Sequence, residues 1–128
     1  MPPDSQHRDF SCRTWGDKFR CAFRGIRCGI RDQRSFYVHF GMTAAVIACA
    51  VIFRATLWQW CVLLVCISVV LTAEMFNSSL EHLGKIITDQ HDERMRDALD
   101  IGSAAVLMAS IGAAIVGAII FISLLLQH

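Results

Sequence analysis

The last 28 residues of the chain, Ile101 to His128, read IGSAAVLMASIGAAIVGAIIFISLLLQH and contain no Asp, Glu, Lys or Arg. A helix needs roughly 20 residues to cross a bilayer core of about 30 Å, so this run is long enough to span a membrane. Two further uncharged runs, residues 35–53 and 55–73, are also long enough. A chain of 128 residues has too little left to cover three such helices in water. We therefore predict an all-α integral membrane protein with three transmembrane helices.

The remaining sequence divides around these runs. Residues 1–16 include Pro2, Pro3 and Ser5 and are typical of a flexible N-terminal tail. The length suits one domain, so we expect a single membrane domain over residues 17–128. Its predicted elements are a surface helix over 17–33 and spans over about 35–54, 56–87 with a cytoplasmic extension, and 97–126.

The residues before the first span have the pattern of an amphipathic surface helix. Phe19, Phe23, Ile26 and Ile30 recur at helical spacing on one narrow face, and cations lie on either side of that face. Such a helix lies in the headgroup layer, held there by apolar burial and by attraction to anionic lipids. An ordinary cytoplasmic helix that packs on its neighbours remains an alternative.

The distribution of positive charge predicts the orientation of the chain. Eight of the 12 Lys and Arg residues precede residue 36, and Lys85, Arg94 and Arg96 lie between the second and third spans. Cytoplasmic loops carry the excess of cations, so we expect the N-terminus and this connection inside the cell. The first connection and the C-terminus then face outward.

Small residues recur along the third span. Ala105, Ala109, Ala113 and Gly117 are four residues apart, a spacing that lets helix backbones approach closely within lipid. These small residues on one face predict close packing of this helix against another, either within one subunit or between subunits. The spacing does not determine how many subunits associate.

Three polar residues near the end of the second span require an explanation. Glu74, Asn77 and Glu81 are spaced i, i+3, i+7, so they project from one side of a helix. A carboxylate against hydrocarbon costs a few kcal/mol, so it must face protein, water or a ligand. A buried Glu74 would suit a general base. Alternatively, the three residues pair with Arg or with lipid headgroups.

Acidic residues also precede the third span. Asp97 and Asp100, with acids across the connection, would suit a divalent metal bound together with a nucleotide, because Mg²⁺ takes one or two carboxylates plus phosphate oxygens and water. The alternative for Asp100 is a favourable interaction with the helix dipole. The sequence has no GxxxxGK, HRD or DFG motif, which excludes a P-loop and a protein-kinase fold.

Two segments carry a resemblance to a known family. Residues 74–81, EMFNSSLE, are followed after 18 residues by residues 100–107, DIGSAAVL. Together they resemble the paired motifs of the bacterial diacylglycerol kinase and undecaprenol kinase family, and the resemblance covers roughly residues 18–122. It implies a homotrimer of three-span subunits in the bacterial inner (plasma) membrane. It also implies transfer of the ATP γ-phosphate to a lipid hydroxyl, with Mg²⁺ and ATP as cofactors and no nucleic-acid partner.

The resemblance also implies roles for individual residues. Glu74 would be the catalytic base that takes the proton of the lipid hydroxyl, and Ser103 would join it in binding that lipid. Glu81 and Gln33 would hold the metal. The residues of the implied nucleotide site are Asn77, Glu81, Gln90, His91, Asp92 and Asp100.

Three positions depart from the family pattern. Leu99 stands where a phosphate-binding Lys is common, Gln33 replaces a metal-binding Glu, and Lys85 replaces an acid. These departures leave open a non-catalytic family relative that acts as a membrane scaffold. A proton-coupled transporter using Glu74 is a third alternative, although three spans per chain suit an exchanger poorly.

Overall fold

The structure is a computed structural model that describes residues 14–31, 34–87 and 92–127. Its described residues form four α-helices and no strand, so the predicted all-α class is confirmed. The helices are α1 (Trp15–Arg31), α2 (Arg34–Ile52), α3 (Leu57–Ile87) and α4 (Glu93–Leu126). The N-terminal tail predicted over residues 1–16 lies almost entirely outside the described residues.

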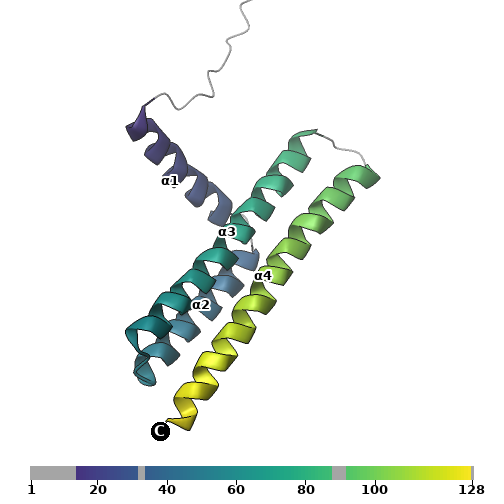
Figure 1. Ribbon diagram of the computed structural model, residues 1–128. Coiled ribbons are helices and arrows are strands. Elements are labelled where there is room, and N and C mark those ends of the chain that lie inside the picture. The colour runs from purple at the N-terminus through teal and green to yellow at the C-terminus, as the bar shows by residue number, and fades with distance from the viewer. Residues whose placement is uncertain (1–13, 32–33, 88–91, 128) are drawn as a thin grey trace, which may run out of the picture.

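The two longest helices form the centre of the arrangement. α3 and α4 lie side by side, and α2 packs along the first half of α3 (Figure 1). α1 leaves this bundle at an angle and contacts α3 near its middle. The α2–α3 connection and the C-terminus lie at the same end of the bundle.

Three of the four helices have the length and composition of membrane spans. α2, α3 and α4 contain 19, 31 and 34 residues and are apolar enough to cross a bilayer, as the sequence predicted. At about 1.5 Å per residue, α3 is about 46 Å long and exceeds a hydrocarbon core of about 30 Å. α3 therefore extends beyond the core without a break.

Local hydrogen bonds explain where the helices begin. Thr56 and Gln59 exchange hydrogen bonds at the start of α3: the Thr56 amide donates to Gln59 Oε1 at 2.8 Å, and the Gln59 amide donates to Thr56 Oγ1 at 3.4 Å. Thr14 and Asp17 make the same kind of reciprocal pair before α1. Such capping boxes satisfy amides that have no partner inside the helix. This cap is why α1 begins at Trp15, two residues before the predicted start.

Apolar side chains are mostly exposed within the single chain. Among the described residues, the buried hydrophobic ones are Phe36, Ala50, Leu63 and Leu124, whereas Ile101 and Met108 of α4 are 71% and 75% exposed. An apolar surface of this extent indicates contact with lipid or with other subunits.

Candidate active site

The polar segment of α3 begins close to one edge of the expected hydrocarbon core. Glu74 comes 17 residues after Leu57, which corresponds to about 26 Å along the helix. Glu81 lies two turns further on, about 36 Å from Leu57 and therefore beyond a core of about 30 Å. With the core taken to begin at Leu57, the segment is expected to cross the boundary between hydrocarbon and water at the end of the bundle where α3 ends and α4 begins.

Glu74 is held from two sides by α2. Its side chain is 2% exposed, and its Oε1 accepts a hydrogen bond from the Ser35 hydroxyl. Its Oε2 lies 3.6 Å from Nε2 of His39, whose side chain is 18% exposed. Ser35 and His39 are four residues apart, so they project from the same face of α2 toward the carboxylate. The carboxylate is therefore buried but not left without polar contacts.

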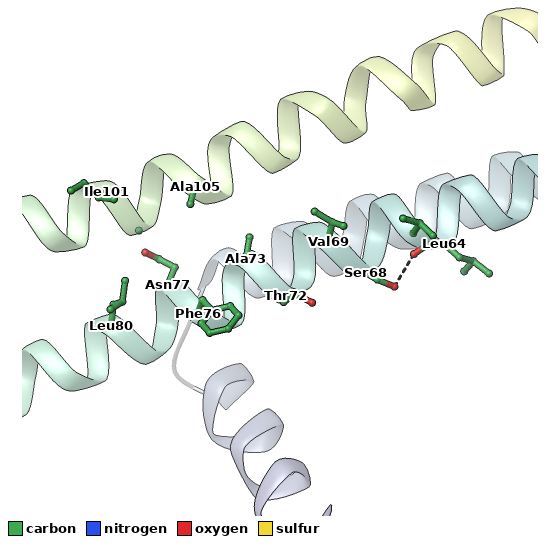
Figure 2. A pocket seen from close by; sticks show the side chains of 12 residues that line it. Leu64, Ser68, Val69, Thr72, Ala73, Phe76, Asn77, Leu80, Ile101 and Ala105 are labelled. Carbon is green, nitrogen blue, oxygen red and sulfur yellow. Dashed lines mark hydrogen bonds between the residues drawn. The ribbon is translucent and has the colours of Figure 1, made fainter.

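Asn77 and Glu81 form a second polar pair, one turn further along α3. Asn77 Nδ2 donates to Glu81 Oε1 at 3.2 Å, and the Asn77 side chain is 7% exposed. Figure 2 shows Asn77 reaching from α3 toward α4. Its Oδ1 is buried, and no hydrogen-bond partner for it occurs among the described residues. A buried acceptor without a partner costs stability and suggests a site for an unrepresented donor or cation.

Gly102 of α4 makes the position of Asn77 possible. A Cβ atom at Gly102 would lie 2.7 Å from Asn77 Oδ1 and 2.9 Å from Leu80 Cδ1. Both distances are shorter than any normal contact, so α3 and α4 can approach this closely only because residue 102 has no side chain. The glycine therefore determines where the Asn77 amide sits.

An apolar groove runs along α3 and α4, and on α3 it extends from Leu64 past Asn77 to Leu80. It has a volume of about 750 Å³, and its lining is dominated by hydrocarbon (Figure 2). Its walls come from α3 and from the segment of α4 between Ile101 and Ala105. The lining residues are Leu64, Val65, Ser68, Val69, Thr72, Ala73, Phe76, Asn77, Leu80, Ile101, Gly102 and Ala105.

The predicted site residues at and after the start of α4, namely Asp92, Asp100 and Ser103, have exposed side chains. Asp100 is exposed and makes no hydrogen bond or ion pair with another described residue. It precedes Gly102 by two positions, about 200° around the helix, so it faces away from Asn77. Ser103 is also exposed. Asp92 caps α4 by accepting a hydrogen bond from the Arg94 amide at 2.8 Å.

Three of the predicted residues, Gln33, Gln90 and His91, lie outside the described residues. Within the described part, no three His, Cys, Asp or Glu side chains are grouped so as to hold a metal ion. The Glu81 carboxylate and the buried Asn77 Oδ1 are oxygen donors of the kind that Mg²⁺ takes when it is bound mainly through nucleotide phosphates and water. They do not form a cage made of protein ligands alone.

Sequence reasoning missed the roles of Ser35, His39 and Gly102. The i, i+4 spacing of Ser35 and His39 was a usable signal, because it places two polar side chains on one face at the entry to an apolar span. Gly102 carried a weaker signal, since a glycine inside a long helix is unfavourable by about 1 kcal/mol and needs a packing reason.

Comparison with known proteins shows the family of the chain. The sequence profile described as prokaryotic diacylglycerol kinase matches residues 20–121, which include all four helices in whole or in part. The chain belongs to this family. The prokaryotic diacylglycerol kinase match and the three apolar helices together identify a bacterial membrane protein.

Two relatives carry kinase names. An undecaprenol kinase of Bacillus subtilis is 29% identical over 119 residues, which cover 93% of this chain and 97% of that protein. A diacylglycerol kinase of Synechocystis sp. is 31% identical over 110 residues, covering 85% of this chain and 63% of the relative. No solved structure matches the chain significantly. Membership of the family and the names of these relatives indicate a lipid kinase.

Proposed function

We propose that the protein is an ATP-dependent lipid kinase that transfers the γ-phosphate to the hydroxyl of a membrane lipid, diacylglycerol or undecaprenol. One observation carries the proposal: a carboxylate that is 2% exposed, Glu74, is held by two polar groups near the expected edge of the hydrocarbon core. A general base for a lipid hydroxyl must sit at this depth, because the hydroxyl of such a lipid lies at the interface.

Glu74 is the proposed catalytic base. Phosphoryl transfer depends on positioning and on charge stabilisation more than on covalent chemistry with the protein. A carboxylate whose two oxygens are already oriented by Ser35 and His39 loses little freedom when an acceptor hydroxyl arrives. The apolar groove along α3 and α4 offers room for a hydrocarbon chain of that acceptor, with Ser103 as a further proposed contact.

The proposed nucleotide site lies on the water side of Glu74. We propose that Asn77 and Glu81 belong to it and that Asp92 and the connection residues Gln90 and His91 line it. Asp100 faces away from Asn77 within the single chain, so it would join this site only from another subunit of the proposed homotrimer. Glu81, with Gln33, would hold Mg²⁺, which neutralises phosphate charge when it is bound. The Asn77–Glu81 hydrogen bond orients the Glu81 carboxylate before the nucleotide binds. One of three exposed cations near this end of the bundle, Lys85, Arg94 or Arg96, is proposed to replace the Lys that is absent at Leu99.

The proposed topology places this chemistry at the cytoplasmic side of the bacterial plasma membrane, with the N-terminus inside. α1 is the proposed surface helix, since Phe19 and Phe23 are 64% and 70% exposed and would be buried in the headgroup layer. We also propose a homotrimer, which would cover part of the exposed apolar surface of α4.

A non-catalytic scaffold is the second candidate, and Leu99 favours it. Its Cδ1 lies 3.8 Å from the position of a Cβ built on Gly84, so Leu99 packs against α3 and presents no cation to a phosphate. A scaffold would bind no MgATP. Calorimetry on the intact purified protein distinguishes the two candidates, because the kinase requires Mg²⁺-dependent ATP binding.

The test of the kinase is transfer of labelled phosphate from ATP to lipid by the purified protein. Vesicles contain diacylglycerol in one arm and undecaprenol in the other. We expect Mg²⁺-dependent product in at least one arm and near-complete loss in Glu74→Gln. The matched control is Glu93→Gln, the same chemical change at an exposed carboxylate of α4, which should retain activity. Absence of product in every arm would reject the kinase, and unchanged turnover in Glu74→Gln would reject Glu74 as the base.

A further inference from the structure

The contact between Glu74 and His39 raises the question of where the proton of the lipid hydroxyl goes after transfer. Glu74 is 2% exposed, so it cannot release a proton directly to bulk water. His39 lies on its Oε2 side and is more exposed, with 18% of its side chain accessible. The pair therefore leads from a buried oxygen to a side chain at the surface of the single chain. His39 lies about 8 Å along α2 from the exposed charged residue Arg34, where the span meets the headgroup layer and water.

We propose that His39 is the group through which Glu74 returns this proton to water, and that Ser35 orients the carboxylate for the exchange. The inference rests on the proposed function, since it requires Glu74 to act as the base. In this proposal His39 acts on Glu74 and not on either substrate, so it is a positioning residue.

The proposed step conserves atoms and charge. The lipid O–H bond breaks as the oxygen bonds to the γ-phosphorus, and the proton passes to a Glu74 oxygen while ADP leaves with the electrons of the broken P–O bond. The protonated Glu74 then donates to Nε2 of His39, which forms an imidazolium. The imidazolium loses a proton to water, so both side chains return to their starting state and one proton is released per turnover.

The residue types and their geometry suit this exchange. Imidazole takes up and releases protons readily near neutral pH, which an amide or a hydroxyl does not. The 3.6 Å separation between His39 Nε2 and Glu74 Oε2 is longer than a hydrogen bond. Catalytic hydrogen bonds are often long without substrate and shorten in the reacting complex. Among the described residues, Glu74 is the carboxylate that lies close enough to His39 for an ion pair.

Ser35 determines which oxygen of the Glu74 carboxylate faces His39. Its hydroxyl donates to Oε1, so rotation of the carboxylate away from His39 would break that hydrogen bond. The other oxygen is thereby kept on the side of His39. A base that is oriented by a neighbouring group is a common arrangement in activated sites.

The experiment compares substitutions at His39 in the full-length protein in lipid vesicles, with MgATP and the lipid that serves as acceptor. His39→Gln retains a hydrogen-bond donor but cannot relay a proton. We expect it to lower kcat by about 10²-fold, the lower end of general acid–base effects, without changing KM for MgATP. His39→Ala should lose as much, and added imidazole should restore part of its kcat. Tyr37→Phe, on an exposed face of the same helix, is the control and should retain full activity.

The outcomes separate the relay from the proposed function. Wild-type kcat in His39→Gln would overturn the relay and leave the kinase intact. A folded His39→Ala protein that imidazole does not restore would overturn it as well, with folding checked by thermal unfolding. If the wild-type protein transfers no phosphate to any lipid, the proposed function fails and the relay is overturned with it.

Discussion

Two neighbouring segments of α3 and α4 bury opposite kinds of side chain. Between Glu74 and Gly84, α3 buries a carboxylate, an amide, a hydroxyl and a glycine. Between Ile101 and Ile122, α4 buries only Gly102 and leaves most of its large aliphatic side chains exposed. In water this distribution would be unstable, because burial of polar groups costs free energy and exposure of apolar surface gains none. The contrast is understandable if lipid or other subunits cover α4 and if the polar groups of α3 are retained for chemistry.

The largest effect is expected from a charge on the apolar segment of α4. Ile115 is 56% exposed in the single chain, and Ile115→Arg would place a cation at the depth of the hydrocarbon. An arginine there costs about 2.5–3.5 kcal/mol by insertion scales, which should abolish most of the membrane-inserted protein. The measurement is the amount of protein recovered from membranes.

Ile115→Leu is the control for this substitution and should insert normally. If Ile115→Arg inserted and remained fully folded, the exposed face of α4 would have to contact water, and the membrane interpretation of this segment would be wrong.

An intermediate effect is expected where the two segments meet. Gly102→Ala would push Asn77 Oδ1 away from a Cβ that starts 2.7 Å from it. The displaced amide should weaken its hydrogen bond to the Glu81 carboxylate, and a hydrogen bond to a charged group contributes about 1.5–3 kcal/mol. We expect the affinity for MgATP to fall about tenfold or more, measured by calorimetry.

The matched control is Gly112→Ala on the same helix, where an added Cβ meets no atom within 4 Å of the single chain. Equal MgATP affinity in Gly102→Ala and in the wild-type protein would show that the close approach at Gly102 does not position the Asn77–Glu81 pair.

The smallest effect is expected at the start of α4. Asp92→Ala removes an N-cap and should lower the free energy of unfolding by about 1 kcal/mol. Asp92→Asn keeps a good cap and should preserve stability. The two variants also test the proposed contact with nucleotide. Asp92→Asn removes the charge but keeps the cap, so it should change KM for MgATP without changing stability if the charge contributes to nucleotide binding. If both substitutions leave stability and KM unchanged, Asp92 serves neither purpose.

The spans were predictable because they depend on composition and length alone. Uncharged runs of sufficient length form helices in any bilayer, so α2, α3 and α4 follow from the sequence. The polar side of α3 also followed, since the positions of Glu74, Asn77 and Glu81 around one helix depend only on their spacing.

Contacts between helices were not predictable in the same way. The approach of Ser35 and His39 to Glu74 depends on how α2 is rotated against α3, and the closeness of Asn77 to Gly102 depends on the separation of α3 and α4. The direction in which Asp100 points could not be predicted from the sequence either. Its place in the motif resembles that of the family, but rotation of α4 turns it away from Asn77 within the single chain.

The central claim is that the buried carboxylate on α3 performs the transfer while the neighbouring polar pair holds the nucleotide. The most direct test is a single-turnover reaction on prebound MgATP, with binding measured on the same samples, in Glu74→Gln and Glu81→Gln. We predict that Glu74→Gln binds MgATP like the wild-type protein but transfers no phosphate, whereas Glu81→Gln loses binding. Phosphate transfer by Glu74→Gln at the wild-type rate would contradict the account.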